Sequence, residues 1–188
     1  VDGQIYEHEN LPQLKKTDHS QAGREGEPLG DILKEFHGVY DALIKGHFPC
    51  DVIDEQSVRS EDLSKYDLVI LPNVACTGPA FEDRLREFVR QGGNVLATFE
   101  TSLCDERGRR REEFGLADLL GVRLLRSPLM PHPHFYFVNQ KSPAEVFGDL
   151  TAPLLPAPPV SAEVALAGAE MISPFTVKFK GWDISEVL

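Results

Sequence analysis

Two short apolar runs, separated by an amphipathic segment, constrain the fold of this chain more than any other feature of its sequence. The runs are Leu68–Leu71 and Val95–Phe99, and each has the length and continuity of a strand that is covered on both faces. The segment between them carries apolar residues at helical spacing, from Pro79 to the Gly92-Gly93 pair that ends it. Strand, helix and strand within about thirty residues predict a βαβ unit, in which the two strands are adjacent, parallel and central.

The rest of the chain predicts one α/β domain around this unit. Apolar residues from Ile32 to Ile44 fall on one face of a helix, and Cys50–Ile53 is expected to form a short strand. Beyond Val122, prolines break the chain into short extended pieces. The best strand candidates there are Phe135–Val138, Glu163–Leu166 and Phe175–Phe179. We therefore expect three consecutive parts: a polar N-terminal segment (1–28), an α/β core (29–127) and a proline-rich, β-rich extension of the same domain (128–188).

Charge and cysteine content argue against several classes of partner. The 188 residues include 30 acidic and 19 basic side chains, so the net charge of −11 disfavours binding to nucleic acid. No apolar run reaches the length of a membrane span, so no membrane partner is expected. The three cysteines show neither zinc-ligand nor paired spacing, which favours a reducing compartment such as the cytoplasm. Because the sequence begins at Val1 and stops at Leu188 without a helix cap or polar tail, we expect it to be a piece of a longer protein.

Four segments, in their order and spacing, resemble one known family. They are GVYDALIKGHFPCDVID (38–54), DLSKYDLVILPNVAC (62–76), FVRQGGNVLATFETSL (88–103) and DERGRRREEFGLADLLGV (105–122). Together they are similar to the β-galactosidase trimerisation domain and its relatives in bacterial glycoside hydrolases. The resemblance covers residues 29–122.

The resemblance implies a flavodoxin-like, doubly wound parallel sheet related to class I glutamine amidotransferases, with a short β-rich extension. In that family the domain follows a catalytic (β/α)₈ barrel, assists trimer assembly and can border the mouth of the active site. It therefore implies the barrel and identical subunits as partners, with carbohydrate as a further ligand. The chain departs from the family pattern at Gln4-Ile5-Tyr6, which is a poor first strand, so that strand is either truncated or diverged.

The chain lacks the residues for amidotransferase chemistry. That reaction needs a cysteine on a sharp turn directly after a strand, flanked by glycines, and a histidine that activates it. After Val95–Phe99 the sequence continues with Glu100-Thr101-Ser102, so no thioester can form there. A structural thiol is the favoured interpretation of both Cys76 and Cys104.

Glu100 and Asp105 have both a functional and a structural interpretation. They could serve as the carboxylate pair of a glycosidase, because they follow a parallel strand where ligands bind in such sheets. One loop does not easily supply two opposed carboxylates, however. Pairing of Glu100 with Arg109, Arg110 or Arg111, or capping of a helix, is therefore favoured.

Two further patterns also have both a functional and a structural interpretation. The arginines of Arg107–Arg111 could bind an anion. The neighbouring glutamates instead favour an exposed loop in which acidic and basic side chains balance each other's charge. His132 and His134 have the alternating spacing of some metal ligands, but the lack of a third ligand nearby favours a solvated, proline-rich edge. The Gly92-Gly93 pair precedes a strand rather than a helix, so it is not a phosphate cradle.

We therefore expect no catalytic, cofactor-binding or metal-binding residue here, and interpret the chain as a non-catalytic assembly domain of a larger glycoside hydrolase. One alternative is a free-standing hydrolase or amidotransferase-like enzyme with its site around Asn73, Glu100 and Ser102, and another is a small-molecule-binding module of flavodoxin type. The loop Thr101–Glu113 is expected to be exposed at the carboxyl edge of the sheet, with Arg109–Arg111 facing acidic groups of a neighbouring domain or subunit. The residues expected at an interface or at the rim of a sugar site are Asn73, Glu100, Thr101, Ser102, Asp105, Arg109, Arg110 and Arg111.

Overall fold

The computed structural model describes residues 32–60, 62–129, 136–138, 154–156, 158, 160–173 and 175–176. Within them the elements follow in the order α2 (Ile32–Lys45), α3 (Glu55–Ser60), the 3₁₀-helix η2 (Leu63–Lys65), β1 (Leu68–Leu71), α4 (Pro79–Arg90), β2 (Asn94–Ala97), α5 (Ala117–Leu120), β3 (Val122–Leu129), β4 (Tyr136–Val138), β5 (Leu154–Pro156), β6 (Ser161–Leu166) and β7 (Phe175–Thr176). None of the helices in the described residues is long and apolar enough to span a membrane.

The predicted βαβ unit is present. β1 and β2 pair in parallel along their whole length, from Leu68 opposite Asn94 to Leu71 opposite Ala97, and α4 connects them. The prediction of two adjacent, parallel strands is therefore confirmed, and the fold is α/β. The parallel sheet contains only these two strands in the part of the chain that the structure describes, so a wider doubly wound sheet is not seen there.

The core lies between the two parallel strands and α4. Pro79 begins α4 directly after the extended Gly78, where a fixed φ and a missing N–H suit the first turn. The buried core cluster comprises Val58, Leu63, Val69, Leu71, Phe81, Leu85, Phe88 and Leu116. A Cβ atom at Gly93 would come within 2.2 Å of the Phe88 ring, so the turn that leads into β2 requires glycine.

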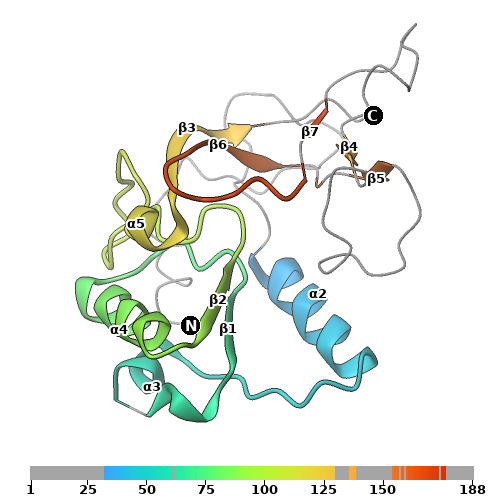
Figure 1. Ribbon diagram of the computed structural model, residues 1–188. Coiled ribbons are helices and arrows are strands. Elements are labelled where there is room, and N and C mark those ends of the chain that lie inside the picture. The colour runs from blue at the N-terminus through green and yellow to red at the C-terminus, as the bar shows by residue number, and fades with distance from the viewer. Residues whose placement is uncertain are drawn as a thin grey trace, which may run out of the picture.

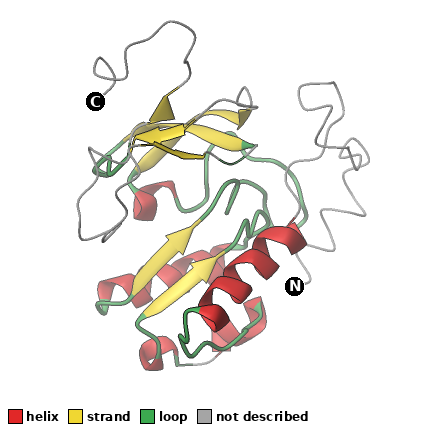
Figure 2. Ribbon diagram, turned by 90° about the vertical axis from the view of Figure 1, so that its right-hand side faces the viewer, coloured by secondary structure: helices red, strands yellow, loops and turns green. Residues whose placement is uncertain are grey.

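The second face of the sheet differs from the expectation. Leu68 and Leu96 remain 45% and 49% exposed, although the sequence predicted strands covered on both faces. Because Val69 and Leu71 point toward α4, the alternation of a strand turns Leu68 to the opposite face, and Leu96 lies on that face as the partner of Ile70. Figures 1 and 2 show α2 beside that face, on the other side of the strands from α4. α2 therefore covers the second face incompletely.

The segment before α3 is a second difference. Cys50–Ile53 forms no strand, because no described segment pairs with it and a strand needs a hydrogen-bonded neighbour. It is attached instead through a side chain, since the Tyr66 hydroxyl donates to Asp51 Oδ2 at 2.9 Å. This contact holds the segment close to the residue that precedes Asp67 and β1.

A β-rich layer follows the α/β unit, as predicted. β3 pairs with β6 in antiparallel fashion, and β4 lies between β5 and β7. The strands expected near residues 135–138 and 163–166 are confirmed by β4 and β6. β7 matches the start of the strand expected at 175–179, of which residues 177–179 lie outside the described residues. Figure 1 shows this layer at one end of the molecule, beyond the ends of β1 and β2. Gly121 makes the turn from α5 into it at φ 65°, where an added Cβ would lie 2.7 Å from the Ala169 nitrogen.

Candidate functional site at the carboxyl edge of the parallel strands

The chain segments that leave β1 and β2 run side by side beyond the strands. The Ser102 N–H donates to the Val74 carbonyl at 2.8 Å and the Cys104 N–H donates to the Ala75 carbonyl at 2.8 Å. The Thr77 N–H in turn donates to the Cys104 carbonyl at 3.1 Å. This short parallel ladder carries the two strands' direction into the loop region. It therefore fixes the edge of the sheet where ligands bind in open α/β folds.

Three residues predicted for an interface or sugar-site rim hold this edge together from inside. Asn73, Thr101 and Ser102 are 1%, 1% and 0% exposed. The Thr101 hydroxyl donates to the Leu71 carbonyl at 3.0 Å and accepts from the Val74 N–H at 3.1 Å. The Ser102 hydroxyl accepts from the Leu116 N–H at 3.1 Å. Their side chains are therefore occupied by the polypeptide backbone of the domain.

The turn after β2 is sharper than the sequence indicated. β2 ends at Ala97 rather than at Phe99, because Phe99 takes φ 47°, in the left-handed region. Asn73 and Ser102 also have positive φ, at 50° and 67°. Thr98 supports the turn by accepting from the Asn73 N–H at 2.9 Å. The sharp turn directly after the strand, where an amidotransferase would carry its cysteine, is thus made by Phe99, which cannot act as a nucleophile.

Glu100 is buried and bound within the chain. It is 1% exposed, and its Oε1 accepts from Arg110 Nη2 at 3.0 Å and from the Ser127 hydroxyl at 2.5 Å. Arg110 also donates to the Ser127 carbonyl at 2.8 Å. The interpretation that Glu100 pairs with one of the three arginines is confirmed. The contact joins the end of the parallel sheet to β3.

Asp105 is fixed within its own loop. Its Oδ1 accepts from the N–H groups of Arg107 and Arg109 at 2.9 Å each, and its Oδ2 accepts from Arg109 Nε at 2.8 Å. Partial burial acts to raise the pKa of Asp105, but these backbone and side-chain donors outweigh it and hold the pKa below its ordinary value. Asp105 is therefore an ionised structural group, and a carboxylate of this kind cannot serve as a general acid near neutral pH.

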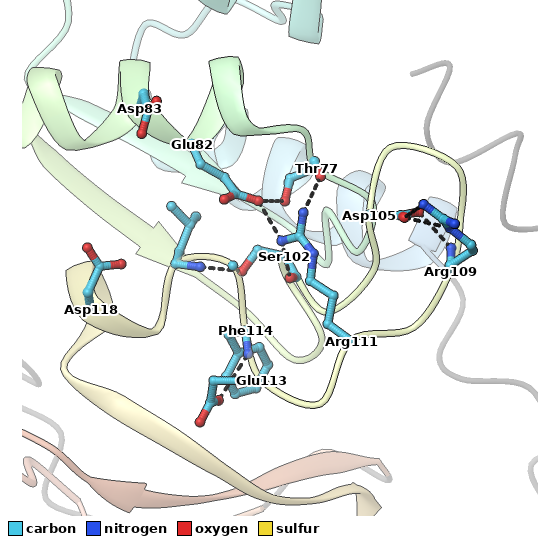
Figure 3. A network of polar contacts seen from close by, with 12 residues as sticks. Thr77, Glu82, Asp83, Ser102, Asp105, Arg109, Arg111, Glu113, Phe114 and Asp118 are labelled. Atoms are coloured by element: carbon cyan, nitrogen blue, oxygen red, sulfur yellow. Dashed lines mark hydrogen bonds and ion pairs between the residues drawn. The ribbon is translucent and has the colours of Figure 1, made fainter.

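A buried ion pair that the sequence did not reveal lies behind this loop. Arg111 Nη1 donates to Glu82 Oε1 at 2.6 Å, and its Nη2 donates to the Thr77 carbonyl at 2.8 Å. The Thr77 hydroxyl also donates to Glu82 Oε1, at 2.6 Å (Figure 3). Glu82 is only 7% exposed, although it lies on an amphipathic helix where a charged residue normally faces water. No local sequence signal identifies it, since its partners come from two distant segments.

The expected exposure of Thr101–Glu113 is therefore wrong for part of that loop. Thr101, Ser102, Leu103 and Cys104 are buried, because they continue β2 as a paired segment, while the surface is formed by residues from Glu106 onward. Figure 3 shows Arg109 turned toward Asp105 and Arg111 turned inward toward Glu82. Arg110 pairs with Glu100, so each of the three arginines forms an ion pair with a carboxylate of the same chain.

Glu35 approaches the same edge from α2. Its carboxylate oxygen Oε2 is buried without a hydrogen-bond partner. Burial raises the pKa of Glu35, and a hydrogen bond with the Thr98 side chain opposes that shift in part. The sequence did not indicate this residue, because the helical pattern of α2 identifies only its apolar side chains as buried.

No group of three or more metal-type side chains is found among the described residues. His132 and His134 lie outside them, so the interpretation of that pair is not tested here. Cys76 and Cys104, in contrast, are brought together as direct partners in the parallel ladder beyond the strands.

The family model of the β-galactosidase trimerisation domain matches residues 5–167. The chain belongs to this family. Among curated relatives it is similar to the β-galactosidase BgaA of Planococcus sp. (strain 'SOS Orange'), with 37% identity over 76 residues, 40% of this chain and 11% of that protein. It is also similar to the exo-β-D-glucosaminidase of Thermococcus kodakarensis, with 27% identity over 109 residues, 58% of this chain and 14% of that protein.

Solved structures agree with this assignment. The β-galactosidase from Bacillus circulans sp. alkalophilus superposes with a TM-score of 0.65 and 25% identity, over 81% of this chain and 22% of that one. The β-galactosidase from Rahnella sp. R3 gives a TM-score of 0.57 and 25% identity, over 72% of this chain and 19% of that one. The trimerisation-domain chain thus spans about a tenth of its first curated relatives and about a fifth of these solved chains.

Proposed function

We propose that this trimerisation domain is a non-catalytic part of a larger, β-galactosidase-like glycoside hydrolase, in which it contacts the catalytic barrel and identical subunits. The observation that carries the proposal is the match to a trimerisation domain over residues 5–167, combined with relatives that are far longer than the matched region. The carboxyl edge supports a non-catalytic role. Its two candidate carboxylates, Glu100 and Asp105, are held by arginines of the same chain.

The finer fold proposed for the domain is a flavodoxin-like, doubly wound sheet of the class I amidotransferase type. It is supported by the parallel β1–β2 pair, its α4 crossover and helices on both sides. A two-stranded parallel sheet is marginal alone, and parallel sheets are normally covered on both faces. The half-exposed Leu68 and Leu96 are therefore consistent with a sheet that continues further.

The domain division is retained as part of the proposal, with a polar segment (1–28), a core (29–127) and a β-rich extension (128–188). β3 begins in the core and ends in the extension, and it contacts the core through Ser127 and Arg110. This continuity supports a single domain.

Among the residues proposed for an interface or carbohydrate rim, Arg109 and Arg110 offer the most surface. Their side chains are 72% and 37% exposed. Because Asp105 and Glu100 already neutralise them, they would present oriented N–H groups to a partner more than net charge. Asn73, Thr101 and Ser102 would act indirectly, by holding the edge in shape.

The test uses the longer protein that carries this chain. Arg109→Glu should weaken subunit assembly, measured by light scattering, and alter hydrolysis of an aryl galactoside. Arg59→Glu on α3 is a matched control, since this arginine is also exposed and also pairs with an acidic side chain four residues earlier in the chain. Equal behaviour of the two variants would remove the loop from the interface.

A second measurement addresses catalysis directly. The 188-residue chain is expected to hydrolyse neither aryl galactosides nor glutamine. Steady turnover that disappears in Glu100→Gln would overturn the non-catalytic assignment.

A further inference from the structure

Cys76 and Cys104 are far apart in the sequence but adjacent in the fold. They are direct partners in the parallel ladder beyond β1 and β2, where the N–H and the carbonyl of Cys104 bond to the residues on either side of Cys76. Opposed residues of neighbouring strands direct their side chains to the same face, so the two thiols leave the ladder on one side.

The spacing of such a ladder suits a covalent bond between these side chains. Neighbouring strands lie about 4.7–4.9 Å apart. The Cα atoms of a disulfide are usually separated by about 4.4–6.8 Å. A Cys76–Cys104 bond therefore falls within the normal range of backbone separation.

Access to the pair is limited by burial. Cys76 and Cys104 are 4% and 2% exposed. On its other side Cys104 is bridged to Arg110, and the Arg111 N–H donates to the Leu103 carbonyl at 2.8 Å. Because both side chains are buried, a reagent can reach the sulfurs only after local opening of this part of the fold. Cys50, which is partly exposed and lies before α3, provides a comparison thiol in the same chain.

We propose that Cys76 and Cys104 form a modification site, at which a small-molecule disulfide such as glutathione disulfide converts the two thiols into an intrachain disulfide. One cysteine thiolate attacks the small disulfide, forming a mixed disulfide and releasing one small thiolate. The second cysteine thiolate attacks the protein sulfur of that mixed disulfide and releases the other small thiolate. The two cysteines are oxidised, the small disulfide is reduced to two thiols, and these take up the two cysteine protons.

The bond ties the segment that leads from β1 into α4 to the segment that leads from β2 into the arginine loop (residues 105–113). It fixes the carboxyl edge, and it restricts the unfolded chain by closing a long loop. Oxidation therefore stabilises the domain and holds the arginine loop against the ladder. This consequence is independent of the assembly role proposed above.

The experiment treats the purified protein with glutathione disulfide, with and without a low concentration of urea that promotes local opening, and then digests it with trypsin. Arginines 84, 86 and 90 separate the two cysteines, so a disulfide links two distinct peptides in the mass spectrum. We expect this linked pair, a rise in the midpoint of thermal unfolding of about 5–15 °C, and reversal of both by a reductant.

Two variants and one control make the result specific. Cys76→Ala and Cys104→Ala should each abolish the linked peptides and the thermal shift, while Cys50→Ser should retain both. Modification only at Cys50, mixed disulfides that never resolve, or a linked pair without a thermal shift would overturn the proposal. Should one alanine variant fail to fold, linkage and shift in the Cys50→Ser protein still decide it.

Discussion

Replacing Glu82 with alanine removes the acceptor of two hydrogen bonds and leaves a half-buried cation without its carboxylate partner. Glu82 Oε1 accepts from Arg111 Nη1 and from the Thr77 hydroxyl, each at 2.6 Å. The Glu82 side chain is 9% exposed and that of Arg111 is 24% exposed. Alanine at this position therefore leaves the Arg111 guanidinium without its carboxylate partner, in a place that water reaches only in part.

The size of the effect follows from this geometry. Removing one partner of a buried ion pair costs about 3–5 kcal/mol in the free energy of unfolding. Arg111 keeps two carbonyl acceptors, at Thr77 and Ser102, and it retains some solvent contact, so the lower end applies. We expect a loss of about 3 kcal/mol, which lowers the midpoint of thermal unfolding by about 6–12 °C for a chain of this size.

The assay is urea unfolding followed by far-ultraviolet circular dichroism. Asp83→Ala is the matched control, because Asp83 is the next residue on α4 and its side chain is 75% exposed while it pairs with Arg86 at 3.0 Å. An exposed pair of this kind contributes less than about 1 kcal/mol. A Glu82→Ala loss within about 0.5 kcal/mol of the Asp83→Ala loss would falsify the argument that the pair is buried and structural.

Three further predictions concern Gly115, Gly38 and Glu35. Gly115→Ala should destabilise the domain by about 1–3 kcal/mol in urea unfolding, since an added Cβ would lie 1.9 Å from Arg111 Nη1 and 2.3 Å from Glu82 Oε1. Gly38→Ala should instead stabilise it by about 0.5–1 kcal/mol, because a Cβ on α2 would meet no atom within 4 Å; a loss of stability would contradict the helical assignment. Burial raises the pKa of Glu35 in the folded state above its ordinary value of 4.5, so the stability linked to this group is fully present below that value and is lost as pH rises through the folded pKa. Glu35→Gln should therefore be more stable than the wild type at pH 7 and no more stable at pH 4, and an equal difference at both pH values would contradict this.

The candidate site shows which kinds of inference the sequence supports. Pairing of Glu100 with a nearby arginine was predictable, because both residues belong to one short stretch with clear charge alternation. The role of Glu82 was not, because Arg111 reaches it from a loop that follows a separate strand. The same limit applied to Thr101 and Ser102. They were expected in an exposed loop because the loop follows a strand and is rich in charge, but the backbone of a neighbouring segment takes up their hydrogen bonds.

The sequence by itself determined the βαβ unit, since continuous apolar runs, helical spacing and glycine turns are properties of neighbouring residues. It indicated the family through the resemblance of four segments between residues 38 and 122. The tertiary structure decided which charged residues lie inside, where the turn after β2 becomes left-handed, and that Cys76 meets Cys104. The physical reason is that the cost of burying a charge or a hydroxyl depends on the partners available to it. Those partners come from other segments, so only the packing of β1, α4 and the arginine loop against one another settles them.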